Sequence, residues 1–259
     1  MELRQQPQKS ISMQEKHDIE TYSKLAEGAT FFLNESFRYV NESLIDESAA
    51  KIFSKLIDKI EPSDKDRELL KTPMPEKAID LLQLKRLDVI SEETIAKMSF
   101  EWHRAQNLAR TQKAKFKYNH RINSIELLGH LNNLGFFIET LTNRHLLFLV
   151  QSKQLDTLSY SRFSTAKIME RLLFIFKDEL TTNKFTLNEI ANLFSLRNKT
   201  VHYTPENAVA LKPTISELFQ IWKQCIQLIE KFEKVQKFNE IKFSIDLKNH
   251  FEQFKQNWT

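Results

Sequence analysis

Few residues in this 259-residue sequence interrupt regular structure, since it holds only three glycines and six prolines. Glycine and proline are the strongest breakers of helices. Their scarcity, together with long stretches rich in Leu, Lys, Glu, Gln and Ala, predicts an all-α protein. The three glycines are scattered and form no phosphate-binding loop, which argues against a P-loop or Rossmann nucleotide enzyme. No serine or cysteine hydrolase arrangement is readable either.

Cysteine is also nearly missing. Cys225 is alone, which excludes an intramolecular disulfide and a cysteine-based metal site, and a reducing, cytoplasmic setting is the simplest interpretation. Glu126 and His130 lie four residues apart, as two metal ligands on a helix can, but two ligands do not make a site. We therefore expect neither a metal nor another cofactor.

No part of the sequence indicates a membrane segment. The polar residues 1–8 lack the apolar core of a signal peptide. No run approaches the roughly 20 uninterrupted apolar residues that a membrane span requires. We expect no contact with a membrane.

Positive charge is present in modest excess but is unevenly distributed. The formal net charge is +4, with 38 basic against 34 acidic residues. Residues 102–125 contain no acid at all, and Phe116 and Tyr118 lie among their basic residues. Such a run is typical of a surface that binds a nucleic-acid backbone, and equally of a solvated helix face whose aromatic residues point inward. The candidate RNA-binding residues are Arg104, Arg110, Lys113, Lys115, Lys117, Arg121 and, farther along the chain, Lys199.

The first half of the chain reads as consecutive helices. A capping box at residues 12–15 predicts a helix to residue 27. Apolar residues at helical spacing predict another over 47–60, ended by Pro62. Further helices are expected over 76–87 and from Ser91 into the basic run.

From about residue 120 the apolar periodicity becomes stronger. It predicts long helices over 125–150 and 158–180, a third that a capping box at 186–189 begins, and a fourth that begins at residues 213–217. Thr204 and Pro205 suit the first turn of a helix between the last two. Helices joined by short links form a bundle. We therefore divide the chain into an N-terminal helical region (1–116), a bundle of four to five helices (117–238) and a helical tail (239–259).

One short segment of this bundle carries chemistry: Arg197-Asn198-Lys199-Thr200-Val201-His202. Arginine offers a planar set of donors for phosphate oxygens, and histidine exchanges protons near neutral pH. Residues five apart on a helix are separated by about 140°, so Arg197 and His202 cannot share one face of a straight helix. Either the helix breaks between them, or a two-fold axis brings two copies of the segment together.

These groups suit the metal-independent cleavage of RNA. His202 fits the proton transfers, Arg197 fits the phosphate, and Asn198 fits the orientation of either group. Attack by a ribose 2′-hydroxyl would spare DNA and leave 2′,3′-cyclic phosphate ends. The alternatives are structural: His202 can satisfy carbonyls at a helix end, and Arg197 can form a surface ion pair.

The arrangement Arg197-Asn198-x-x-x-His202, late in a helical bundle, resembles the motif of the HEPN superfamily (higher eukaryotes and prokaryotes nucleotide-binding). The resemblance extends over about residues 120–236 and leaves the N-terminal hundred residues unexplained. It implies an endoribonuclease with a composite active site between two copies of the chain, in a toxin–antitoxin, abortive-infection or antiviral setting. An antitoxin or other regulatory protein is then expected as a partner.

Other residues are candidates to support this site. Glu139 and Asn143 share a face of the first bundle helix, and Glu139 can anchor Arg197; both can instead belong to a solvated or dimer-facing polar stripe. Tyr203 follows the motif directly. The competing hypotheses for the whole protein are a non-catalytic helical module that binds RNA, nucleotides or proteins, and a structural oligomerisation bundle.

Overall fold

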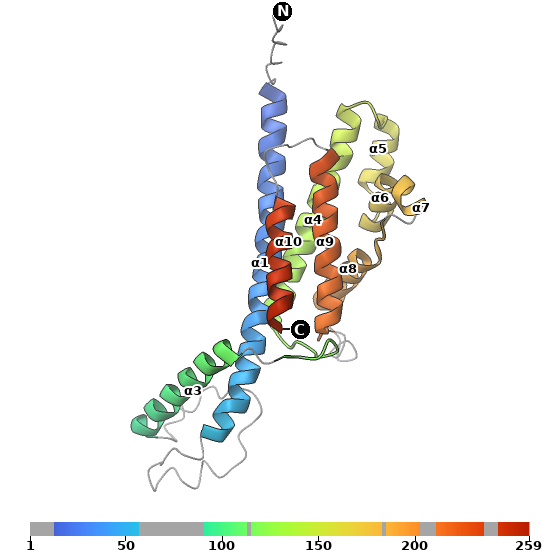
Figure 1. Cartoon of the computed structure of the whole chain (residues 1–259). Helices are drawn as coiled ribbons and strands as arrows, with labels where there is room; N and C mark the ends of the chain where they lie inside the picture. The colour runs from blue at the N-terminus through green and yellow to red at the C-terminus, as the bar shows by residue number, and fades with distance from the viewer. Residues whose placement is uncertain are drawn as a thin grey trace, which may run out of the picture.

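The computed structural model describes residues 13–56, 91–112, 115–182, 185–202, 211–235 and 243–258. Within those ranges the protein is all-α, and its one extended pairing there is an isolated bridge between Arg121 and Thr214. Figure 1 shows the arrangement of the helices. They are α1 (Met13–Leu56), α3 (Glu92–Gln112), α4 (Ile125–Gln151), α5 (Thr157–Ser164), α6 (Ile168–Ile175), α7 (Lys177–Thr181), α8 (Asn188–Val201), α9 (Ile215–Val235) and α10 (Phe243–Trp258).

α1 is one continuous helix of 44 residues, about 66 Å long, and runs beside both α4 and α3 (Figure 1). The expectation of separate helices over 12–27 and 47–60 was wrong. No proline interrupts residues 13–56, and buried residues recur every three or four positions from Tyr22 to Phe53. Tertiary packing along that whole face therefore stabilises a single helix.

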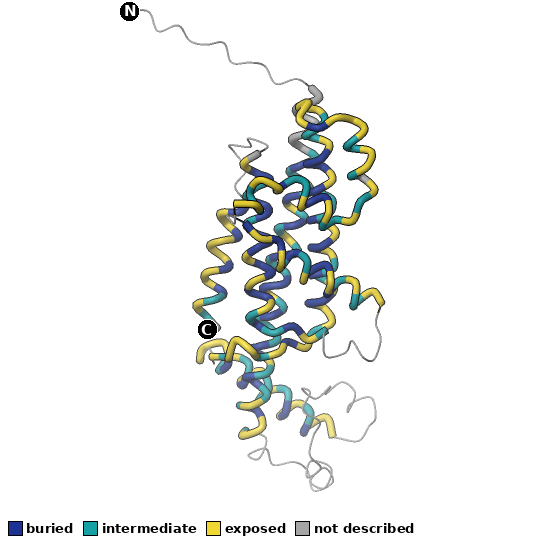
Figure 2. Tube along the Cα trace, turned by 90° about the vertical axis from the view of Figure 1, so that its right-hand side faces the viewer, coloured by how far each residue is buried: buried dark blue, intermediate teal, exposed yellow. Residues whose placement is uncertain are grey.

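The core lies between α1, α4, α9 and α10, whose inner faces are buried along most of their length (Figure 2). More than half of the α9 residues are buried, and Trp222 is fully buried. An aromatic cluster joins α1, α9 and α10 around that tryptophan. Its members are Phe37, Phe219, Trp222, Phe251 and Phe254. Aromatic pairs of this kind add to the apolar area that they bury.

α1 and α4 approach closely at Gly28. A Cβ atom at that position would lie 2.2 Å from Cε1 of Phe137, so any larger residue would displace the ring. The ring of Phe137 stacks on Phe32 of α1, with centroids 5.5 Å apart. A glycine thus sits inside a long helix because the neighbouring helix occupies the space of its side chain.

The lower part of α1 packs against α3, below the main bundle in Figure 1. The expected division of the chain at residue 116 falls between α3 and α4, whereas α1 packs against helices on both sides of that point. The segment that links α3 to α4 also contacts the start of α9. The backbone N–H groups of Ile215 and Ser216 donate to the carbonyls of His120 and Tyr118, which satisfies two free donors of the first turn of α9.

The helix expected over 158–180 is instead three short helices, α5, α6 and α7. Asp156 caps α5 by accepting a hydrogen bond from the backbone of Ser159, and the chain turns at Thr165 and Ala166. The carbonyl of Ala166 accepts a bond from the side chain of Arg171 rather than from the helix backbone. A second break at Phe176 places its ring in the core.

α8 begins at Asn188 with the help of a residue from α9. The expected capping box at 186–189 was wrong, because Leu187 precedes the helix and makes no side-chain cap. Instead, Oε1 of Gln224 accepts hydrogen bonds from the backbone N–H groups of Glu189 and Ile190, at 2.8 and 2.9 Å. Nε2 of Gln224 donates to the hydroxyl of Thr186. A buried amide therefore replaces the local cap.

Carboxylates cap the N-terminal ends of α9 and α10. Thr214 and Glu217 form a capping box at the start of α9, where the sequence predicts that a helix begins. Glu233, near the end of α9, accepts bonds from the backbone and hydroxyl of Ser244 at the start of α10. Burial raises the pKa of the Glu233 carboxyl. α10 lies within the expected helical tail 239–259.

Several expectations fall outside the described residues: the helix over 76–87, the capping box of Ser12 and the turn at Thr204 and Pro205.

Cys225 lies in the core, where burial raises the pKa of its thiol to about 12. Across the described ranges, no helix has both the length and the apolar character needed to cross a bilayer.

Replacing Gln224 by alanine is expected to lower the free energy of unfolding by about 2 kcal/mol, because two backbone donors and one hydroxyl lose their partner. Urea denaturation measures this change. Gln220→Ala, an exposed position on the same helix, is the matched control and should change stability little. Equal effects of the two substitutions would show that the bonds from Gln224 contribute nothing to stability.

His145 is expected to make stability depend on pH. Burial, and secondarily the charge of Arg144, lowers its pKa from 6.5 to about 4. Below pH 6.5 the imidazole of His145 therefore binds a proton in the unfolded chain but stays neutral in the folded chain. The free energy of unfolding falls as the pH drops towards 4. The loss reaches about 2 kcal/mol at pH 5. Urea midpoints between pH 7.5 and 5 should fall less in His145→Leu, while His103→Leu, at an exposed histidine, should behave as the parent.

Candidate functional site

The segment Arg197–His202 forms the C-terminal end of α8. The helix continues to Val201, and His202 is its C-cap residue, with φ −109° and ψ 58°. The backbone N–H of His202 donates to the carbonyl of Asn198 at 2.9 Å. The side chains of Asn198 and His202 are exposed, and their spacing of four residues puts them on one side of the helix.

Arg197 points to α4 instead. Its aliphatic stem lies against Gly135, where a Cβ atom would be 3.4 Å from Cδ of Arg197. Its guanidinium carbon is 5.9 Å from the ring centroid of Phe194, one turn earlier on α8. The small residue on α4 and the aromatic ring on α8 therefore form the floor on which the arginine lies.

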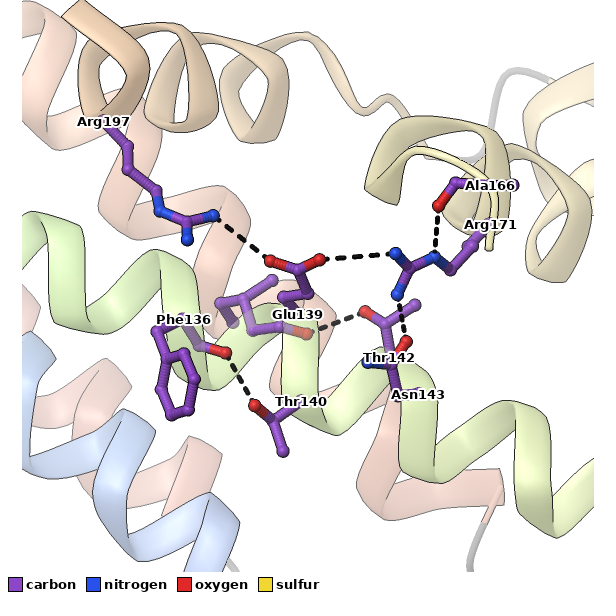
Figure 3. Close-up of polar contacts among 9 residues, drawn as sticks. Phe136, Glu139, Thr140, Thr142, Asn143, Ala166, Arg171 and Arg197 are labelled. Carbon is purple, nitrogen blue, oxygen red and sulfur yellow. Dashed lines mark hydrogen bonds and ion pairs between the residues drawn. The ribbon is translucent and has the colours of Figure 1, made fainter. Parts of the chain in front are cut away.

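Glu139 of α4 binds the guanidinium group. Nη1 of Arg197 donates to Oε2 of Glu139 at 3.2 Å, and Nη2 of Arg171 donates to Oε1 at 3.3 Å (Figure 3). One carboxylate thus lies between two arginines that come from α6 and α8. The contact between Glu139 and Arg197 that the sequence allows is therefore present.

Arg171 is the member of this cluster that sequence reasoning missed. Only 9% of its side chain is exposed. Its Nε donates to the carbonyl of Ala166 at 2.7 Å, and its Nη1 donates to Oδ1 of Asn143. Asn143 therefore supports Arg171, and among the described residues it makes no bond to the motif. The signal that could have revealed Arg171 is an arginine on the helical face of Ile168, Leu172 and Ile175, because a buried charge requires a partner.

The cluster retains positive charge. One carboxylate against two guanidinium groups leaves a net charge of +1. Among the residues that the structure describes, Glu139 is the only acceptor of a hydrogen bond from Arg197, and it binds Nη1 alone. Nε and Nη2 are therefore available to an anion, and 31% of the side chain is exposed.

Arg197 and His202 do not meet within one chain. Among the described residues, no hydrogen bond, ion pair or ring contact joins either Arg197 or Asn198 to His202 through side chains. The helix does not break between Arg197 and Val201. Arg197 and His202 therefore point to different sides of α8, as the helical spacing predicts. Tyr203 lies outside the described residues.

The candidate RNA-binding residues are spread over three elements. Arg104 and Arg110 are exposed on α3, and Lys199 is half-buried on α8. In the link between α3 and α4, Lys115 donates to the carbonyl of Gln256, Arg121 donates to the carbonyl of Lys212, and Lys117 is exposed. Lys113 lies outside the described residues.

The aromatic residues of the basic run divide between the two interpretations. Phe116 is half-buried and packs against the core, whereas Tyr118 is 51% exposed. Among the described side chains, no group of three or more His, Cys, Asp or Glu residues is arranged to hold a metal ion.

Comparison with protein-family models, with curated proteins and with solved structures finds no match to this chain.

Glu139 is expected to stabilise the fold mainly through Arg171. Double-mutant cycles with alanine at Glu139, Arg171 and Arg197, measured by urea denaturation, separate the two pairs. We expect a coupling free energy of about 1–3 kcal/mol for Glu139 with Arg171, because that arginine is buried. The coupling with Arg197 should stay below about 1 kcal/mol, because nearly a third of its side chain is in water. The reverse order would assign the structural role to Arg197.

Proposed function

We propose that this chain is a metal-independent endoribonuclease of the HEPN type, active as a homodimer. Arg197 would bind the scissile phosphate and stabilise its developing charge, His202 would transfer protons, and Asn198 would orient the reacting groups. The residue pattern of the motif is the starting point of this assignment. The observation that carries it furthest is the position of Arg197 in the cluster with Glu139 and Arg171.

The cluster supports a phosphate site for an electrostatic reason. A lone ion pair with Glu139 would neutralise Arg197, but Arg171 already compensates that carboxylate, so a positive charge remains. Glu139 then fixes the direction of the guanidinium group without cancelling it. Donors held in place before the reaction stabilise a charged transition state better than mobile ones, because they need no reorganisation.

The positions of the two proposed reacting residues support a site shared with a second copy of the chain. Arg197 faces α4, and His202 is exposed on another side of α8. A two-fold axis would bring the arginine of one copy to the histidine of the other. The outer face of α4 next to Gly135 and Glu139 supports such an interface, because Phe136 is 53% exposed and Leu147 is 40% exposed. Phe31 of α1 is linked to this apolar surface by a series of ring contacts, from Phe31 to Phe32, from Phe32 to Phe137 and from Phe137 to Phe136.

The reaction follows from these roles. One His202 removes the proton of the ribose 2′-hydroxyl, and the resulting oxygen attacks the adjacent phosphorus. Arg197 stabilises the negative charge of the pentacoordinate phosphorane. The bond to the 5′-oxygen then breaks as a protonated histidine gives that oxygen a proton. The products are a 2′,3′-cyclic phosphate and a free 5′-hydroxyl, and DNA cannot react.

The setting that we propose follows from the resemblance alone. A ribonuclease of this kind would act in the cytoplasm, in toxin–antitoxin, abortive-infection or antiviral defence, and an antitoxin or regulatory protein would restrain it. The competing function is a non-catalytic module that binds RNA, nucleotides or proteins. The ion pair between Glu139 and Arg197 favours that alternative, because the carboxylate of Glu139 competes with the scissile phosphate for the guanidinium group.

Cleavage of total RNA in excess EDTA tests the proposal. The parent chain should cut RNA and leave cyclic phosphate ends, and His202→Ala and Arg197→Ala should each lose at least about a hundredfold in rate. Arg197→Lys should stay impaired, because a lysine cannot provide two parallel donors. His103→Ala, at an exposed histidine on α3, is the matched control and should retain full activity. Intact RNA with the parent chain, or equal cutting by parent and His202→Ala, would contradict the assignment.

A mixing experiment tests the composite site. In a 1:1 mixture of Arg197→Ala and His202→Ala chains, about half of the dimers contain one chain of each kind. If each site combines Arg197 of one copy with His202 of the other, one site of every mixed dimer is intact, and about a quarter of the parent activity returns. No recovery, although co-purification of two differently tagged chains shows mixed dimers, would place both residues of a site in the same chain.

A further inference from the structure

A cavity of about 390 Å³ lies at the junction of α1, the end of α3 and the segment 115–120. Its residues come from three parts of the chain that meet where α3 leaves the bundle. None of them belongs to the cluster of Arg197, Glu139 and Arg171. Its volume is within the range of small-molecule sites, about 300–1,000 Å³, and is larger than a single phosphate ion requires.

The charge of this cavity favours an anion. Lys51 of α1 and Lys115 and Lys117 of the link all line it, and no carboxylate does so among the described residues. Among the described residues, Glu47 pairs with one of these lysines, and its carboxylate lies 2.9 Å from Nζ of Lys51. Three ammonium groups against one neighbouring carboxylate leave a net charge of +2. Side-chain ammonium groups of lysine bind phosphate as point charges.

The same carboxylate also contacts the wall of the cavity. Oε2 of Glu47 is 2.6 Å from Nε2 of His120. The ring of His120 lies against Phe116, with centroids 4.9 Å apart. Nζ of Lys51 is 5.5 Å from the centroid of the same phenyl ring. The basic groups and the aromatic ring are therefore parts of one arrangement.

The remaining lining suits a flat heterocyclic ring. Phe116, Ile52 and Ala109 form an apolar wall, and the side-chain amides of Gln112 and Asn119 lie at the same cavity. An amide offers both donors and an acceptor, as the edge of a nucleobase does. Aromatic and apolar walls bind the face of a base, whichever base it is.

We propose that this cavity binds a nucleotide: its phosphate against Lys51, Lys115 and Lys117, and its base against the apolar wall, within reach of the two amides. The ligand is either a free nucleoside monophosphate or one unit of an RNA strand, since both present the same groups. This inference shares no residue with the proposed ribonuclease centre and does not depend on it. Lys51 is distant in sequence from the basic run 102–125 and lies beside it only in the folded chain.

Calorimetric titration of the full-length His202→Ala chain tests the proposal without cleavage of the ligand. AMP, GMP, CMP and UMP, a short single-stranded oligoribonucleotide, the nucleosides and inorganic phosphate are titrated separately. We expect saturable binding of at least one nucleotide, weakened by about tenfold in Lys51→Gln and in Lys117→Gln. Both side chains are exposed, so both variants should keep their helical circular dichroism.

Lys97→Gln is the matched control. Lys97 is an exposed lysine of α3 that pairs with Glu93 at 2.8 Å and four residues' spacing, just as Lys51 pairs with Glu47. It should bind nucleotides as the parent does. An oligoribonucleotide that binds much more tightly than the mononucleotides identifies an RNA strand as the source, and similar affinities identify a free nucleotide.

Three results would overturn the proposal: no saturable binding of any nucleotide or of the oligoribonucleotide, equal binding by Lys97→Gln and the two cavity variants, or binding of inorganic phosphate as tight as that of the nucleotides. Because binding is measured in a chain without His202, these outcomes are independent of whether the parent chain cleaves RNA.

Discussion

The need to satisfy the backbone groups at helix ends governs how this bundle is assembled. α9 is buried between its neighbours and provides caps for two of them: Gln224 for α8 and Glu233 for α10. A free backbone donor that is buried costs about 1–3 kcal/mol, so each of these bonds fixes where a neighbouring helix begins. The start of α8 determines in turn where its last turn, with Arg197 and His202, lies on α4.

The same principle explains the cluster at Glu139. Arg171 is buried because α6 packs on α4, and a buried guanidinium group requires a carboxylate. The structural ion pair with Arg171 and the contact with Arg197 use the two oxygens of one side chain. A residue that holds the fold together thus also sets the direction of the residue that we propose to bind phosphate. The cavity at Lys51 repeats the pattern, since Glu47 contacts both Lys51 and His120.

The helices were predictable where packing follows local periodicity, and not where it depends on distant residues. The helices over 125–151 and 215–235 follow their apolar patterns, and the second begins where the sequence predicts. The break at Ala166 could not be predicted, because it depends on a bond from the side chain of Arg171. The start of α8 could not be predicted either, because its cap lies 34 and 35 residues away in the chain.

The sequence by itself determined the all-α class and the chemistry of the motif, because residue type and helical spacing are local properties. The distance of five residues between Arg197 and His202 already separates them on one helix. Only the tertiary structure decided which neighbours they have. Glu139 could anchor Arg197 or lie in a polar stripe, and the packing of α8 on Gly135 selects the anchor. Contacts between α4, α6 and α8 arise from the folded chain as a whole, so no local pattern encodes them.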